Sequence, residues 1–436
     1  MTNFILIWFG QLVSLTGSGL TRFALGVWVY QSTQSVTLFT LITLCNTLPL
    51  ILITPLAGSL VDRWPRRWVM ILSDSGNCLC TLGIAILLAN HSLNIYSIYV
   101  LTAINCILNT FQWPAYAAAI TLLVPKNQLT RASGLTQVAE AVGQLFSPVL
   151  AAVLLVSIGL QGIIVIDLVT FSFAFLTLIL SRFPEPDNVN FKFDFSINFL
   201  LKEFVDGWNY VVIRPGLLSL LVFFATCNFL IGFITVLFAP LVLSLFSSIT
   251  LGWLESIGGI GMVLGSLTLI ARSEPKRYID TIFILFWAIA LSVIIAGWHS
   301  SIIVLAIANF VIYFCAPIIF SCSQVIWQRK IPLEVQGRVF ALRRMVARSC
   351  IPLAALIAGP LDELVFEPLM AVNGLFANSL GQFIGTGTGR GIDLIFIVAG
   401  ISILIISIVA YQYPRLRFIE DELPDAIPTL ESSLSR

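Results

Sequence analysis

Three polar side chains share one face of an otherwise apolar segment. Gln137, Glu140 and Gln144 are spaced i, i+3 and i+7, so on a helix they point the same way. An ionisable side chain within a bilayer costs about 2.5–3.5 kcal/mol on insertion scales, so this face should line a water-filled cavity. Two interpretations stay open. Glu140 binds a proton or a cationic substrate, or it pairs with Arg131, about two helical turns away near the inner end of the helix.

Other polar residues lie in long apolar segments and are candidates for the same pathway. Asn105, Asn109 and Gln112 follow one helix face, and Gln11 lies in the first apolar segment. Arg22 lies further along that segment. It either extends to the lipid headgroups or attracts an anionic group of a substrate.

Three acidic residues in apolar segments have simpler expected roles. Asp74 should pair with Arg66 or Arg67. Asp167 and Glu255 lie near outer segment ends, where we expect water to solvate them.

The elements that would position these side chains are membrane-spanning helices. Of the 436 residues, 58% are hydrophobic and 10% are charged, whereas soluble domains are about half apolar and a quarter charged. A spanning helix needs about 20 apolar residues. Twelve segments meet this length and predict an all-α membrane protein: 4–30, 36–60, 68–88, 96–123, 133–158, 163–180, 217–246, 253–270, 281–298, 301–327, 339–358 and 394–411.

The basic residues predict the orientation. Apart from Arg22 and Arg390, every Lys and Arg falls in loops or helix ends on the side of the N-terminus. The positive-inside rule therefore predicts an even number of spans with both termini cytoplasmic. Matching glycines and prolines at an offset of about 207 residues, such as Gly58 with Gly265 (265 − 58 = 207), indicate that two six-helix halves arose by duplication.

We expect four parts. They are an N-terminal six-helix bundle (1–182), a cytoplasmic linker with an amphipathic helix over 197–212 (183–216), a C-terminal bundle (217–414) and a cytoplasmic tail (415–436).

A short basic turn carries the most specific motif. It reads G-x-L-x-D-R-x-x-R-R, with Gly58, Asp62, Arg63, Arg66 and Arg67 at the named positions. This pattern resembles the loop between helices 2 and 3 of the major facilitator superfamily of secondary transporters. The resemblance implies that Asp62 meets the start of helix 11 and holds the inner side closed in one conformation.

The resemblance extends over nearly the whole chain and points to the bacterial branch of macrolide-efflux and siderophore-export proteins. Phe111, Pro114 and Ala115 in the fourth segment resemble that branch, as does the Gly337-Arg338-Val339-Phe340 run. It implies transport by alternating access, usually with proton antiport.

The fifth helix also resembles the superfamily's antiporter motif, G-x-x-x-G-P-x-x-G-G. It keeps Gly143 and Pro148, but Ser147, Ala151 and Ala152 replace three glycines. Ordinary packing of small residues therefore stays open as an alternative.

Several classes of function are disfavoured. The net charge of +1 gives no field for nucleic acid, the eight cysteines and two histidines show no metal spacing, and no nucleophile–base set indicates an enzyme. The glycine-rich run 385–391 follows no predicted strand, so we expect a flexible tether and not a nucleotide site.

The sequence thus predicts a monomeric exporter in the bacterial cytoplasmic membrane, without cofactor or metal, that moves amphipathic small molecules using protons or another ion. Uptake or lipid-linked transport by the same fold, and a non-transporting receptor, are the alternatives.

Overall fold

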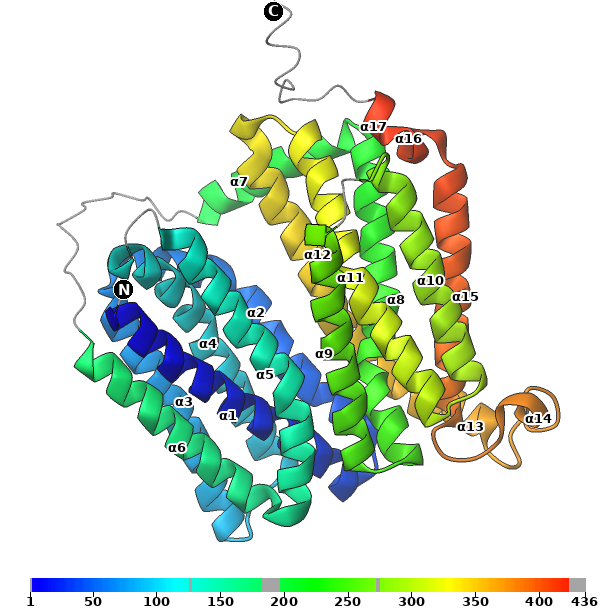
Figure 1. Cartoon of the computed structure of the whole chain (residues 1–436). Coiled ribbons are helices and arrows are strands. Elements are labelled where there is room, and N and C mark those ends of the chain that lie inside the picture. The colour runs from blue at the N-terminus through cyan, green and yellow to red at the C-terminus, as the bar shows by residue number, and fades with distance from the viewer. Residues whose placement is uncertain (1, 125–127, 182–196, 272–274, 423–436) are drawn as a thin grey trace, which may run out of the picture. The chain divides into compact units, whose positions relative to one another are not determined.

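The computed structural model describes residues 2–124, 128–181, 197–271 and 275–422, and this part of the chain is helical with no strand. Its first six helices appear in blue to teal in Figure 1. They are α1 (Thr2–Thr33), α2 (Val36–Arg63), α3 (Arg66–Ala89), α4 (Ile95–Leu123), α5 (Leu129–Ser157) and α6 (Gly159–Leu180).

Six more long helices follow the connecting helix α7 (Ile197–Val212). They are α8 (Pro215–Leu245), α9 (Ser248–Ala271), α10 (Tyr278–Trp298), α11 (Ile302–Lys330), α12 (Leu333–Leu361) and α15 (Arg390–Gln412). Short elements complete the chain: a π-helical turn (Asp362–Phe366), α13 (Glu367–Met370), α14 (Gly381–Ile384), α16 (Pro414–Arg417) and α17 (Ile419–Glu422).

The helices agree with the predicted spans. Within the described residues, eleven of the long helices are long and apolar enough to cross a membrane, and α5 contributes a shorter apolar run, Leu145–Ser157. Most of these helices extend a few residues beyond the predicted segments. The largest difference is α12, which begins at Leu333 and not near residue 339, because a helix continues past the apolar run into the polar interface.

The chain forms two compact units. The first unit comprises Met1–Phe193, Leu237–Gly259 and Ala355–Glu363, and the second comprises Asp194–Val236, Ile260–Ala354 and Leu364–Arg436. The predicted four-part division at residues 182, 216 and 414 stays a prediction.

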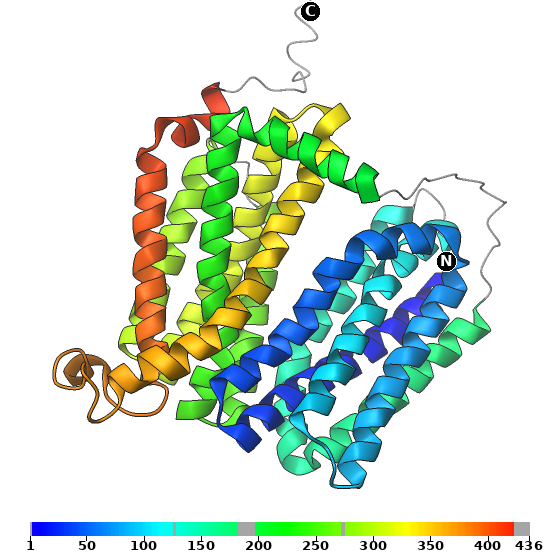
Figure 2. The same ribbon diagram turned by 180° about the vertical axis from the view of Figure 1, so that it is seen from behind.

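In the first unit, α1 is surrounded by its neighbours. It packs against α2, α4, α5 and α6, while α3 packs against α4 and α6 (Figures 1 and 2). Glycines allow α1 and α6 to approach closely: a Cβ at Gly10 would overlap Thr177, and one at Gly17 would overlap Thr170. Two apolar clusters lie along the helices, one around Met70 and Leu178 and the other around Val29 and Ile163. This packing leaves the polar side chains of α1, α3, α4 and α6 facing one another in between.

In the second unit, α10 packs against α11 and α15. Phe223 of α8 contacts Phe283 and Phe286 of α10 edge-on or tilted, with ring centroids 5.1 Å apart in both pairs. The amphipathic helix α7 is held to α12 by an ion pair of 3.3 Å between Asp206 and Arg338. The bounds of α7, Ile197–Val212, confirm the predicted helix over 197–212, and its place on the cytoplasmic surface stays a prediction.

Candidate functional site

A cavity of about 50 Å³ lies among helices of the first unit. One part of its wall is apolar and consists of Leu25, Ile42, Ile84 and Leu101. The polar part includes Arg22 and Thr21 of α1, Asn46 of α2, Asn105 of α4 and Asp167 of α6. The cavity has one apolar and one charged side, and its volume of about 50 Å³ holds a few water molecules or one small polar group.

Asp167 is the acidic group of this cavity. Its side chain is 1% exposed, and Oδ2 accepts hydrogen bonds from Thr21 Oγ1 at 2.7 Å and from Thr81 Oγ1 at 3.4 Å. Its Oδ1 has no hydrogen-bond partner within the described part of the chain. A buried carboxylate with incomplete hydrogen bonding is costly, so a positive charge in the adjoining cavity would stabilise it.

The expected solvation of Asp167 is therefore wrong. The residue lies eight positions inside α6, which begins at Gly159, so a rise of about 1.5 Å per residue places it about 12 Å from the helix end. Sequence analysis missed it as a site residue, yet the signal existed. Asp167 is the only charged residue of α6, and an intramembrane ionisable side chain is by itself a functional hypothesis.

Arg22 lines the cavity. Its side chain retains solvent access, and it lies within electrostatic range of the carboxylates of Asp167 and Glu255 of α9. Glu255 is half-buried and belongs to the same compact unit. Two carboxylates thus accompany one guanidinium, so the group has a net negative charge when all three are ionised.

A second polar group, called the amide cluster here, lies around Asp74. It consists of Gln11 of α1, Asp74 and Asn77 of α3, and Gln112 of α4. Gln11 Nε2 donates to Asp74 Oδ2 at 3.1 Å, and Gln112 Nε2 donates to Asp74 Oδ1 and, at 3.1 Å, to Gln11 Oε1. The side chain of Asp74 is 2% exposed. Two glutamines from different helices therefore hold a single buried carboxylate.

A chain of amides connects the cluster to the cavity. Asn77 Nδ2 donates to Gln112 Oε1 at 3.4 Å and to Asn109 Oδ1 at 3.0 Å. Asn109 Nδ2 in turn donates to Asn105 Oδ1 at 2.8 Å, and Asn105 lines the cavity. The predicted polar face of α4 therefore lies against α1 and α3, and it links the two polar groups.

The expected pairing of Asp74 with Arg66 or Arg67 is wrong. Within the described residues, Asp74 is bonded by glutamines, while Arg67 Nη2 donates to the carbonyl oxygen of Ile179 at 2.9 Å. Asp74 follows Arg66 by eight positions, which is more than two turns along α3. The partners of Asp74 come from neighbouring helices instead.

The remaining predicted site residues fall into two groups. The side chains of Gln137, Glu140 and Gln144 in α5, and of Gly58, Asp62 and Arg63 at the end of α2, lie outside the described residues. Of the antiporter-like residues, Gly143 has open space where a Cβ would stand, and the carbonyl oxygen of Pro148 lies 2.7 Å from a Cβ built at Gly252. Pro148 thus lies at a close approach of α5 and α9.

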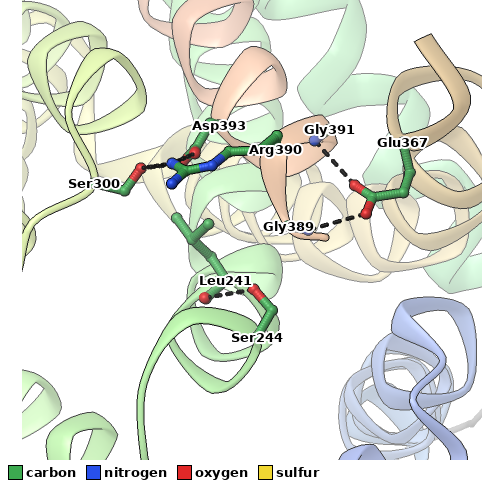
Figure 3. A network of polar contacts seen from close by, with 8 residues as sticks. All are labelled: Leu241, Ser244, Ser300, Glu367, Gly389, Arg390, Gly391 and Asp393. Atoms are coloured by element: carbon green, nitrogen blue, oxygen red, sulfur yellow. Dashed lines mark hydrogen bonds and ion pairs between the residues drawn. The ribbon is translucent and has the colours of Figure 1, made fainter. Parts of the chain in front are cut away.

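The glycine-rich run before α15 is held in place by an acidic side chain. Glu367 accepts from the backbone N–H groups of Gly389 and Gly391, both at 3.0 Å (Figure 3). Beside it, Asp393 accepts from Ser300 Oγ at 2.6 Å and pairs with Arg390 at 2.7 Å. A carboxylate therefore occupies the helix N-terminus where a phosphate would bind. The expectation of a flexible tether is wrong for these residues.

Glu367→Gln is expected to speed amide hydrogen exchange at Gly389 and Gly391 about tenfold. The substitution removes the negative charge and one of two charge-assisted hydrogen bonds, a loss of about 1.5 kcal/mol. Hydrogen-exchange mass spectrometry of the peptide covering 385–393 measures the change, with the exposed Glu422→Gln as control. Equal exchange rates in wild type and Glu367→Gln would contradict this account of the loop.

Comparison with known proteins identifies relatives of the whole fold. Macrolide efflux protein A of Streptococcus pyogenes is 26% identical over 361 residues, which cover 82% of this chain and 88% of the relative. Multidrug efflux pump Tap of Mycolicibacterium fortuitum is 23% identical, with 95% of this chain and 97% of the relative covered.

Solved structures show the same fold at low sequence identity. A bacterial homolog of the human lysosomal transporter Spinster has a TM-score of 0.69 at 14% identity, covering 96% of this chain and 98% of that one. The nucleoside transporter NupG has a TM-score of 0.66 at 14% identity, covering 95% of this chain and all of that one (100%).

The family model described as Major Facilitator Superfamily matches residues 7–355, which is most of the chain. Its span includes the basic turn after α2, both polar groups of the first unit and most of the long helices. The chain is a multi-pass membrane protein of the Major Facilitator Superfamily, and its described residues form twelve long helices.

Proposed function

We propose that this protein exports amphipathic small molecules that carry a cationic group, driven by an ion gradient. The cavity beside Asp167 supports the proposal most directly. It places the buried carboxylate of Asp167 next to an apolar wall of leucine and isoleucine. The names of the relatives, a macrolide efflux protein and a multidrug efflux pump, support export of amphipathic compounds.

The charge of the cavity favours a cationic group over an anionic one. Asp167 and Glu255 outnumber Arg22 in the group, so an ammonium would be attracted and a carboxylate repelled. In this proposal Arg22 keeps the two acidic residues from repelling each other when no substrate is bound. Arg22 thus has a balancing role, in contrast to the anion-binding role considered from sequence.

The polar residues along the pathway have assigned roles in this proposal. Asn105 contacts the substrate in the cavity. Gln11, Asn109 and Gln112 belong to the hydrogen-bonded chain of amides that leads from the cavity to the amide cluster. Glu140, with Gln137 and Gln144 on the same face, is the candidate site for the coupling proton or other ion. Asp62, Arg63, Arg66 and Arg67, with Gly58, Gly143 and Pro148, would control the alternation between inward and outward access.

The cellular setting belongs to the same proposal. The chain is expected to act as a monomer in a bacterial cytoplasmic membrane, with both termini in the cytoplasm, as the distribution of basic residues predicts.

Transport into vesicles tests the proposal. Inverted membrane vesicles from cells that produce the protein should accumulate a tertiary-amine macrolide when a proton or Na⁺ gradient is imposed, several-fold above vesicles without the protein. Accumulation only in right-side-out vesicles would favour uptake. No gradient-dependent movement of any of a panel of amphipathic cations would favour a receptor without transport.

A further inference from the structure

The predicted membrane span of α12, residues 339–358, contains three arginines. Arg348 follows the first residue of α12 by 15 positions (348 − 333) and precedes the last by 13 (361 − 348). A rise of about 1.5 Å per residue places it about 23 Å from the first residue. Arg343 and Arg344 lie about one turn nearer that end. A charged side chain in hydrocarbon is costly, so these guanidiniums should face water or polar headgroups.

Two of the arginines share an exposed face. Arg344 and Arg348 are four positions apart, so their side chains are neighbours on the helix surface, and both are exposed. Arg343 is half-buried and lies within electrostatic range of Arg344. Like charges at this range repel one another, so an anion bound among them would stabilise the group.

Arg343 is held in a fixed orientation by α11. Its Nη1 donates to Gln324 Oε1 at 2.8 Å, and its Nη2 donates to Ser323 Oγ at 3.2 Å. Its Cζ lies 5.8 Å from the ring centroid of Phe320 and 5.6 Å from that of Trp327. These neutral partners orient the guanidinium but do not balance its charge.

No ion pair within the described residues includes any of the three arginines. The helices α8 and α11 contact α12 here, and neither contains Asp or Glu. In α7, Asp206 is paired with Arg338. Glu334 is the one acidic residue of α12, and it precedes Arg343 by nine positions (343 − 334), which is more than two turns. The positive charge of this group is therefore left for a ligand to balance.

The chemistry of the group selects a phosphate. A guanidinium is planar and can donate two parallel hydrogen bonds to a phosphate or a carboxylate. A phosphate presents acceptor oxygens in several directions and a carboxylate presents them in one plane, so a phosphate suits several arginines better. Basic pockets between membrane helices typically bind the head groups of anionic lipids. We propose that Arg343, Arg344 and Arg348 bind the phosphate group of an anionic lipid or of a soluble phosphate compound.

This site goes beyond the proposed function, because it lies in the second unit and its occupancy is measured without any transported compound. Purified protein in detergent is titrated with sodium phosphate at constant ionic strength, with sodium chloride as the replacement salt. A second titration adds phosphatidylglycerol to the micelles, with phosphatidylcholine as the replacement lipid. A ligand that binds only the folded state raises the melting temperature, and we expect a saturable rise of several degrees with at least one probe. A rise with phosphate supports a soluble compound, and a rise with phosphatidylglycerol alone identifies the lipid.

Variants assign the rise to the three arginines. Arg348→Gln should weaken the affinity for the probe at least tenfold, because charge-assisted hydrogen bonds are lost. Arg348→Lys keeps the charge without the paired donors and should lie between Arg348→Gln and wild type. Arg415→Gln, the same change at an exposed position of α16, should keep the wild-type response. If Arg348→Gln does not fold, Arg344→Gln takes its place.

The comparison also removes a general effect of the salt. Phosphate stabilises many proteins because it is excluded from their surfaces, and that rise should be equal in wild type and variants. Equal responses of wild type and a folded Arg348→Gln protein to both probes would overturn the site.

Discussion

Asp167→Asn is expected to lower gradient-driven accumulation of a tertiary-amine macrolide at least tenfold. Asparagine has the same shape and can still accept from Thr21, so the packing of α1 against α6 should persist. It removes the negative charge at the cavity. A hydrogen bond to a charged group contributes about 1.5–3 kcal/mol, which corresponds to roughly a ten- to 150-fold change in affinity.

Asp280→Asn is the matched control, because it makes the same chemical change at the N-terminal end of α10. The two variants are compared in inverted vesicles at equal protein levels. A folded Asp167→Asn protein that accumulates the macrolide within twofold of wild type would exclude Asp167 from the substrate site. Loss of transport for neutral and cationic compounds alike would indicate a structural role instead.

Asn109→Leu is expected to weaken binding of a tertiary-amine macrolide about fivefold, as the loss of one hydrogen bond would. Asn109 lies between Asn77 of the amide cluster and Asn105 of the cavity. Leucine is similar in size but cannot donate to Asn105 Oδ1, so Asn105 loses the hydrogen bond that holds its amide in the cavity wall. A net hydrogen bond contributes about 0.5–1.5 kcal/mol, which corresponds to roughly a two- to tenfold change in affinity.

This prediction rests on the proposed function, and the dissociation constant of the purified protein for the macrolide measures it. The exposed Asn209→Leu in α7 serves as control. An Asn109→Leu protein that binds the macrolide as tightly as wild type would rule out the amide chain as a support of the cavity.

The fold could be predicted because its signals are local. Apolar runs of about 20 residues, basic loops on one side and the motif around Asp62 are each contained in short stretches of sequence. The comparisons confirm the family, and they confirm a transporter instead of an enzyme. The duplication of two halves was inferred from an offset between loops and stays a prediction.

The polar groups could not be predicted in full, because they depend on how helices rotate against one another. The polar face of α4 was recognisable from its spacing, but nothing in that spacing indicates that Gln112 meets Gln11 and Asp74. Asp74 was expected to pair with arginines close to it in sequence. Its hydrogen-bond partners are instead on helices that pack against α3 or near it. The role of Glu140 stays a prediction, since its side chain lies outside the described residues.

The central claim is that the carboxylate of Asp167 binds the cationic group of the substrate. Its most direct test is the dissociation constant of purified wild type and Asp167→Asn for two ligands, a tertiary-amine macrolide and a neutral analogue without the amine. We predict that the substitution weakens binding of the amine at least tenfold and changes binding of the neutral analogue less than twofold. Equal effects on both ligands, or none on either, would contradict the claim.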